Sequence, residues 1–201
     1  MSPRVELLTG DALKQGIPHL AQLRIDVFRE WPYLYDGNFD YEQWYLSKFA
    51  ESAGAVIVAA FDGDNLIGAS TAAPLAAQLD DFIAPFKAQG MDPAHVFYFG
   101  ESVLKPAYRG LGLGVAFFVH REARARAHGG IMHTGFCSVL RPGDHALKPA
   151  DYVPLDDFWR RRGYQPVKGM TGPFHWKDID QPGETEKTMQ FWVKRIAAGT
   201  T

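Results

Sequence analysis

The feature that constrains this sequence most is the stretch 96–129, where an apolar run is followed by a glycine-rich turn and then by an amphipathic segment. Residues 96–104 are rich in aromatic and β-branched side chains and predict a buried strand. Pro106 ends it, because proline cannot donate to a β-ladder. A helix is predicted from Leu113 up to Gly129. Such an arrangement directs N–H groups and a positive helix end at one point, which predicts an anion site.

The glycine turn does not match two common phosphate-binding motifs. A P-loop requires Lys and then Ser or Thr after its last glycine, and Val115 and Ala116 stand there instead. The dinucleotide fingerprint G-x-G-x-x-G has a different spacing from Gly110, Gly112 and Gly114. Because these three residues have no Cβ, a bulky ligand can approach the main chain closely.

The run Arg109-Gly110-Leu111-Gly112-Leu113-Gly114 resembles motif A of the GCN5-related N-acetyltransferases (GNAT superfamily). That family's pattern is Arg or Gln, two residues, Gly, one residue, and Gly or Ala. The preceding strand, the proline and the aromatic residue before the arginine match as well. The resemblance implies a single α/β (α+β) domain over residues 1–201. Its fold would be a mixed, mostly antiparallel sheet of about seven strands with a splayed parallel pair, flanked by helices. A purely structural glycine turn is the alternative.

The same resemblance implies that the chain binds acetyl-CoA (coenzyme A). Main-chain amides of the turn would hold the pyrophosphate. The splayed strands would admit the pantetheine arm, which pairs with strand N–H and C=O groups as an extra strand would. The residues assigned to the cofactor on this basis are Val103, Leu104, Arg109, Gly110, Leu111, Gly112, Leu113 and Gly114.

Composition narrows the class of protein. With 201 residues, of which 46% are hydrophobic, the chain can bury a full core in one domain. A net charge of −2 gives no electrostatic reason to expect nucleic-acid or membrane binding. The single cysteine cannot form an internal disulfide, and no apolar signal segment or membrane-length run is present. We therefore expect a cytoplasmic monomer or homodimer without nucleic-acid or membrane partners.

Hydrophobic periodicity and turn residues predict the remaining elements. Strands are expected at 5–9, 55–61, 66–73, 131–140, 174–179 and 187–193. Helices are expected at 12–15, from 18 to about 31, at 40–52 and at 155–162. The resembled family joins the strands at 66–73 and 96–104 by a short turn, so residues 75–95 are interpreted as an inserted helical segment. This segment would form a lid over the acceptor site or cover a flank of the sheet.

The loop 31–37 is dense in aromatic residues, and the resemblance places it beside the acceptor-substrate pocket. Tyr33, Tyr35 and Asp36 are candidates for binding an amine or ammonium group, through cation–π contacts and charge attraction. The alternative is that these aromatics pack the helices onto the sheet. Trp44 and Phe49, on the next helix, are expected to do so.

Glu101 is the single acid on the strand 96–104. A carboxylate in a partly desolvated strand can act as a general base near neutral pH. The resemblance implies direct attack by a primary amine on acetyl-CoA. A small-molecule amine is favoured over a protein N-terminus or lysine, and Glu101 is the base, acting directly or through a water. The alternative is that Glu101 pairs with an arginine such as Arg141 or holds the acceptor's ammonium.

The general acid is where the sequence departs from the family pattern. The family's tyrosine lies four residues before the glycine that closes the last helix, and Trp159 stands there, before Gly163. Tyr152, Cys137 or a water is the candidate acid, and Cys137 is also assigned to the acceptor cleft. A Cys–His nucleophile site that uses His145 is a less favoured alternative. No metal is expected, because paired ligands at short spacing are missing from the sequence.

Two functional hypotheses follow. The first is an acetyl-CoA-dependent N-acetyltransferase, which Glu101 and the aromatic loop favour. The alternative is a catalytically inactive acyl-CoA-binding sensor or interaction domain, which Trp159 favours.

Overall fold

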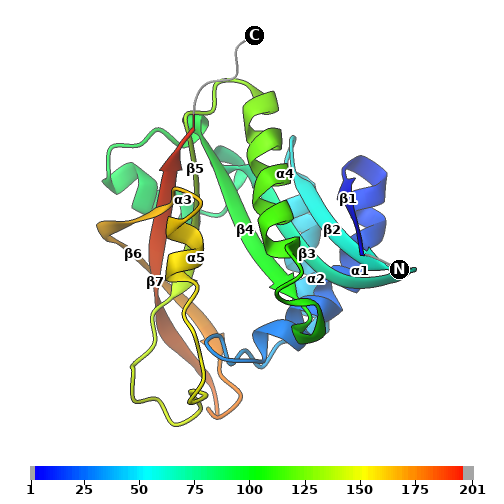
Figure 1. The fold of residues 1–201 in the computed structure, drawn as a ribbon. Coiled ribbons are helices and arrows are strands. Elements are labelled where there is room, and N and C mark those ends of the chain that lie inside the picture. Colours follow the sequence, from blue (N-terminus) through cyan, green and yellow to red (C-terminus); the bar gives the residue numbers. More distant parts are fainter. Residues whose placement is uncertain (1–2, 197–201) are drawn as a thin grey trace.

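The computed structural model describes residues 3–196, which form a seven-stranded sheet covered on both faces by helices (Figure 1). The strand order is β1-β2-β3-β4-β5-β7-β6. The strands are β1 (Arg4–Leu8), β2 (Val56–Asp62), β3 (Asn65–Pro74), β4 (Val96–Leu104), β5 (His133–Val139), β6 (Gln165–Lys177) and β7 (Glu184–Arg195). The helices are α1 (Gly10–Phe28), α2 (Phe39–Ala50), α3 (Asp80–Ala88), α4 (Leu113–His128) and α5 (Asp156–Arg160). Short 3₁₀ turns lie at Leu75–Ala77, Pro93–His95 and Pro106–Tyr108.

Strands β4 and β5 form the parallel pair of the sheet, and α4 connects them. They pair at three positions, Val96 with His133, Phe97 with Thr134 and Tyr98 with Gly135. Beyond Tyr98 they separate, and Figure 1 shows the two strands diverging toward the end of the sheet at which α4 begins. The predicted mixed sheet of about seven strands with a splayed parallel pair is thus confirmed.

Two layers of helices cover the sheet. Helices α4 and α5 lie on one face, where Phe118 and Phe158 pack with Phe97 and Phe99 of β4. Helices α1 and α2 lie on the other face, and α3 packs against β6. Because β2 is covered on both faces, residues Val56 to Ala60 are all buried, which explains their unbroken apolar run.

A β-bulge changes which face the residues of β4 present. Gly100 and Glu101 together oppose Thr71 of β3, because Phe99 pairs with Ala72 and Ser102 with Ser70. Before the bulge, the odd-numbered residues face α4. After it, Glu101 and Val103 lie on the α1 side. An extra residue in one strand re-aims side chains in this way, and here it turns Glu101 toward α1.

Several predicted boundaries were wrong. The helices expected at 12–15 and 18–31 are one helix, α1, with Pro18 inside it. Burial of Leu13, Ile17 and Leu20 on one face outweighs the hydrogen bond that proline cannot donate. Strand β6 begins at Gln165 rather than 174, because Pro166 and Gly169 give its first half the composition of a turn.

The segment expected to be helical at 75–95 contains α3, whose Phe86 is fully buried against Phe191. Phe49 packs in the core as expected, whereas Trp44 is 52% exposed on the outer side of α2, so that expectation was wrong. None of the helices within residues 3–196 combines the length and hydrophobicity that crossing a membrane requires.

Candidate active site

The motif A turn borders open space at two glycines. Gly110 and Gly112 adopt positive φ angles of 81° and 83°, a conformation that favours glycine, and Gly112 caps the start of α4. A Cβ built on either residue would meet no atom within 4 Å. Within residues 3–196, the N–H groups of residues 110–114 have no hydrogen-bond acceptor. The turn and the positive end of α4 therefore form a cradle into which an anion can fit.

The other four residues of the turn that were predicted to bind the cofactor have different environments. The guanidinium of Arg109 bonds Glu30 at 2.8 Å and the carbonyl oxygen of Leu104 at 3.3 Å, which ties the turn to the segment that follows α1. Leu113 is buried in the core beneath the turn, whereas Leu111 is exposed. At Gly114, a Cβ would lie 3.2 Å from the Phe158 ring, so glycine lets α5 approach α4.

The cradle leads to an unpaired strand edge. Val103 pairs with Ala69 of β3, and its side chain is fully buried on the α1 side. Leu104 packs partly buried with the residues around Leu113. On its other edge, β4 pairs with no strand of the described chain beyond Tyr98. An extended ligand could therefore add to β4 there as a strand would.

Glu101 lies on the α1 face and is held by Arg24. Its Oε2 atom accepts a charged hydrogen bond from Arg24 Nη1 at 2.5 Å, and its backbone N–H donates to Thr71 Oγ1 at 3.2 Å. Arg24 also bonds the carboxylate of Glu42, which is 1% exposed. Glu101 therefore pairs with an arginine, as the alternative interpretation of the sequence expected. The partner is Arg24, so the suggestion of Arg141 was wrong.

Arg141 has another role. It bonds Asp178 at 2.6 and 2.9 Å and the backbone carbonyls of Pro32 and Tyr33, which fastens the loop after α1 to the β6–β7 hairpin. Burial alone would raise the pKa of Asp178, but Arg141 and then Lys187, 3.4 Å away, hold it below its usual value. The cluster fixes the loop that carries the predicted acceptor residues.

The three predicted acceptor residues of this loop differ in environment. Tyr33 is half-buried, with its ring centroid 4.5 Å from Phe28 and 5.9 Å from Trp176. Burial raises the pKa of Tyr33. The pKa of Tyr35 is also raised, by burial and then by the nearby Glu42. Asp36 bonds Lys177 at 2.8 Å and Arg29 at 3.2 Å, and these two hydrogen bonds lower its pKa. Its carboxylate therefore already binds two cations of the chain.

The candidate proton donors lie around Tyr33. Cys137 Sγ is 3.1 Å from the Tyr98 hydroxyl, and burial raises the pKa of the thiol to about 12. Tyr33 and Cys137 pack against the same core cluster, and after burial the nearby Cys137 raises the pKa of Tyr33 further. Burial also raises the pKa of Tyr152, whose ring stands edge-on to Trp31 at 5.9 Å.

Trp159 provides no proton donor at this position. Its ring packs 5.1 Å from Phe136 and 4.9 Å from Trp192, in the aromatic core between α5 and the sheet. The His145 ring lies 5.1 Å from the Trp31 ring, tilted by 54°, and within residues 3–196 no hydrogen bond joins His145 to Cys137, whose thiol contacts Tyr98. No group of three or more potential metal ligands gathers within residues 3–196.

Sequence reasoning missed Arg24 and Glu42. A signal was present, because both interrupt apolar helix faces. Glu42 shares its face with Leu46 and Phe49, and Arg24 lies one turn after Leu20. A charged residue on a buried stripe requires a partner in the core.

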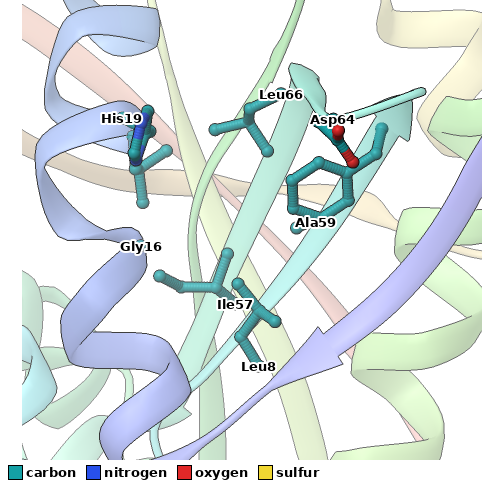
Figure 2. A pocket seen from close by; sticks show the side chains of 9 residues that line it. Leu8, Gly16, His19, Ile57, Ala59, Asp64 and Leu66 are labelled. Atoms are coloured by element: carbon teal, nitrogen blue, oxygen red, sulfur yellow. The ribbon is translucent and has the colours of Figure 1, made fainter.

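A small hollow of about 80 Å³ lies elsewhere, between α1 and the β1–β3 end of the sheet (Figure 2). Its lining is mainly aliphatic, with Leu8, Ile57 and Leu66 on the inside and His19 and Asp64 labelled at its margin. None of the predicted site residues lines it. We therefore place the candidate site at the splay of β4 and β5 and not at this hollow.

No protein-family model and no curated protein matches the sequence. Solved structures are similar throughout the fold. The acetyltransferase of GNAT family from Streptococcus pneumoniae is 12% identical, with 98% of this chain and 100% of that chain covered and a TM-score of 0.58. The ribosomal-protein-alanine N-acetyltransferase from Brucella melitensis is 12% identical, with 96% and 99% covered and a TM-score of 0.60.

A third similar structure is Arabidopsis thaliana NAA60 in complex with a bisubstrate analogue. It is 14% identical, with 98% of this chain and 99% of that chain covered and a TM-score of 0.60. In all three comparisons the match extends over nearly the whole of both chains. The chain thus has the fold of the GNAT acetyltransferases.

Proposed function

We propose that the chain is an acetyl-CoA-dependent N-acetyltransferase that acetylates a primary amine of a small molecule. The observation that carries the proposal is the row of amides at residues 110–114 without acceptors, next to a β4 edge that has no strand partner beyond Tyr98 within residues 3–196. The fold shared with acetyltransferases supports it. Residues 1–201 would form one catalytic domain, with 75–95 as its insertion.

The residues present fit acetyl-CoA. Gly110 and Gly112 leave open space above amides that can bind a pyrophosphate, and a Cβ at either position would enter that space. The β4 main chain at Val103 and Leu104 would pair with the amides of the pantetheine arm. When bound there, acetyl-CoA supplies the activated acetyl group.

Glu101 is proposed as the general base. Arg24 holds its Oε2 atom, whereas its Oε1 atom is buried and has no hydrogen-bond partner in the part of the chain described. The fixed oxygen orients the carboxylate, and the other oxygen can take a proton from the acceptor amine, directly or through a water. The bulge at Gly100 and Glu101 brings this carboxylate to the acceptor side of the sheet.

The proton required by the departing thiol is proposed to come from Tyr152 or from water. With its thiol pKa at about 12, Cys137 remains protonated at neutral pH and fits better as part of the acceptor wall, together with Tyr33 and Tyr35. Trp159 has no proton to give, which is the observation that favours the sensor alternative.

The test is the release of free thiol from acetyl-CoA over a panel of primary amines, compared between the wild type and Glu101→Gln. We expect turnover with at least one amine and a loss of about 100-fold in kcat for the variant. Equal rates for the two proteins would remove Glu101 as the base. Binding of acetyl-CoA without turnover of any amine or peptide would favour the sensor.

A further inference from the structure

A hollow of about 290 Å³ lies between α4, the end of α5 and β7, and none of the residues assigned to the cofactor or the acceptor lines it. One side of it is a single face of α4, because Val115, Phe118, Val119 and Glu122 follow the spacing that aligns side chains along a helix. Val115 and Val119 are 42% and 59% exposed, so apolar surface is open there. We call this space the α4–α5 hollow.

Three cations line the α4–α5 hollow, against a single carboxylate. The cations are Arg161, Arg162 and Lys194, and the carboxylate is Glu122. Glu122 is already neutralised, because Lys194 Nζ donates to its two oxygens at 2.7 and 2.9 Å and Arg126 donates at 3.1 Å. Within residues 3–196, neither Arg161 nor Arg162 pairs with a carboxylate. The lining therefore has an excess of positive charge, in a chain whose net charge is −2.

The two acids of α5 do not balance this charge. Asp156 and Asp157 lie 3.8 and 3.5 Å from the guanidinium of Arg160, and none of these three residues lines the hollow. The Arg160 guanidinium itself lies 5.3 Å from the ring centroid of Trp192. The charges of α5 are thus paired with one another, and the two arginines that follow the helix stay uncompensated.

Arg162 is fixed in place but has few acceptors. Its guanidinium lies 3.4 Å from the ring centroid of Phe158 and 5.9 Å from that of Phe118. Its Nη1 donates to the Phe158 carbonyl oxygen at 2.5 Å, whereas its Nε is buried without an acceptor in the part of the chain described. Burial and then the like charge of Arg161 lower the pKa of Arg162. Two guanidiniums this close are stabilised when an anion binds both.

The α4–α5 hollow adjoins the cradle along α4, and Figure 1 shows α5 beside that helix. Gly112 caps α4 and Val119 follows it by seven residues, which is about 10 Å at 1.5 Å per residue. Between them, Gly114 lets the Phe158 ring approach the helix. A nucleoside that carries phosphates on both sides of its ribose is of this size.

The lining selects a kind of anion. A guanidinium pairs two oxygens of a phosphate at once, so two neighbouring arginines suit a phosphomonoester dianion better than a carboxylate, which has only two oxygens to share. The apolar side chains of Val115, Phe118 and Val119 suit the ring of a base. A volume of about 290 Å³ is at the lower end for small-molecule sites, so the hollow suits a phosphate with part of a nucleoside.

We propose that the α4–α5 hollow binds the phosphomonoester of a nucleotide, with Arg161 and Arg162 on its oxygens and its base beside Val115 and Val119. The same chemistry has two sources, the 3′-phosphate of an acetyl-CoA whose pyrophosphate is in the cradle, or a separate nucleotide. The experiment below distinguishes them. The inference does not depend on acetyl transfer, because it concerns binding alone.

The first arm compares acetyl-CoA with acetyl-dephospho-CoA, which lacks the 3′-phosphate, by calorimetric titration at 0.15 M salt. If the cofactor fills the hollow, the wild type should bind acetyl-CoA at least about tenfold more tightly, as expected for hydrogen bonds between charged groups. This ratio should fall at least about threefold in Arg161→Gln and in Arg162→Gln. Arg160→Gln is the matched control and should keep it. Because Arg161 is exposed, its variant should fold even if Arg162→Gln does not.

The second arm uses adenosine 3′-monophosphate as the probe and adenosine as its uncharged control. A separate nucleotide predicts that the probe binds the wild type both free and saturated with acetyl-CoA, at least about tenfold more tightly than adenosine, and more weakly in Arg161→Gln. Acetyl-CoA and its dephospho form should then bind equally. If the cofactor fills the hollow, acetyl-CoA should exclude the probe, whereas acetyl-dephospho-CoA should admit it.

Two sets of results would overturn the proposal. In the first, adenosine 3′-monophosphate binds no more tightly than adenosine, and acetyl-CoA no more tightly than its dephospho form. In the second, the preference for the phosphate is the same in Arg161→Gln and Arg162→Gln as in the wild type, or Arg160→Gln lowers it equally, so that general surface charge explains it. Neither result affects the proposed function, which thiol release tests separately.

Discussion

The two faces of the sheet present different kinds of polar groups at the point where β4 and β5 separate. On the α4 face, the backbone N–H groups of residues 110–114 have no acceptor within residues 3–196, and the space beside Gly110 and Gly112 is open. On the α1 face, buried side chains from distant segments are bound to one another, as Arg24 is to Glu42 and Glu101. A site built from main chain depends on backbone conformation, whereas a site built from side chains depends on charge balance.

This difference explains how each face can vary. Main-chain amides tolerate almost any side chain as long as glycine permits the turn, so such a cradle suits a constant ligand. A single substitution in a set of paired side chains changes which ligand the set recognises. The α1 face therefore suits a ligand that differs among proteins of one fold. Substitutions can therefore disable one face while the other stays intact.

The largest effect is expected at Gly112. Replacing it with valine strains a left-handed position and places a side chain in the cradle, so acetyl-CoA affinity should fall at least about 1,000-fold. Loss of the thermal stabilisation given by acetyl-CoA measures this. Gly129→Val is the matched control, because Gly129 also has a positive φ with open space around it, at the far end of α4. If both variants retain the shift, phosphate is bound elsewhere.

The second prediction concerns the α1 face. Asp178→Asn leaves Arg141 and Lys187 without a carboxylate in a buried site, so the free energy of unfolding should fall by about 3 kcal/mol in urea titrations at pH 7. The exposed Asp180→Asn should change it by less than about 0.5 kcal/mol.

The same carboxylate gives a pH dependence with a defined sign. The pKa of Asp178 is lowered in the folded state, so its contribution is complete above the unfolded value of about 3.9 and is lost as the pH falls through the folded value. The stability difference between wild type and Asp178→Asn should therefore shrink in acid. A constant difference from pH 7 down to pH 2 would show that Asp178 acts by packing and not by charge.

A third, smaller effect is expected at Arg121, which links the two faces. It is 2% exposed, lies between the rings of Phe99 and Phe118, and donates to the carbonyls of Thr71 and Glu101 at 3.4 and 3.3 Å. Burial lowers its pKa to about 10. Lysine has no planar fork to span two carbonyls, so Arg121→Lys should lower kcat about tenfold and leave acetyl-CoA affinity within about twofold.

The control for Arg121 is on the same helix. Arg126→Lys alters an exposed arginine that pairs with Glu122, so its kcat should match that of the wild type. An equal decrease in both variants, or a decrease confined to acetyl-CoA affinity, would show that Arg121 does not position Glu101.

The smallest effect is expected at Cys137. Its thiol contacts the Tyr98 hydroxyl, and with a pKa of about 12 it remains protonated between pH 6 and 9. Cys137→Ser should therefore change kcat/KM by less than about threefold at every pH in that range. A loss of more than about tenfold, or a new inflection in the pH profile, would assign the thiol to the chemistry.

The sequence predicted the α4 face well because that face is contiguous. The strand at 96–104, the glycine turn and the helix from Leu113 follow one another, and the structure keeps those boundaries. The α1 face joins residues from α1, α2 and β4, so no local pattern could pair Arg24 with Glu101. Trp44 shows the same limit, because an aromatic residue near a buried stripe can still point outward.

The one-residue offset at Gly100 and Glu101 has a consequence for how this strand can change. Because side chains alternate along β4, the offset lets a single segment contribute first to one hydrophobic core and then to the opposite one. Deleting either residue would move the residues up to Leu104 to the opposite face of the sheet. Glu101, or the residue that takes its place, would then lie among the aromatic rings on the α4 side, and Val103 would lose its neighbours on the α1 side. The length of this strand is thereby constrained as tightly as its composition, and insertions or deletions should be tolerated far less there than in the loops at either end.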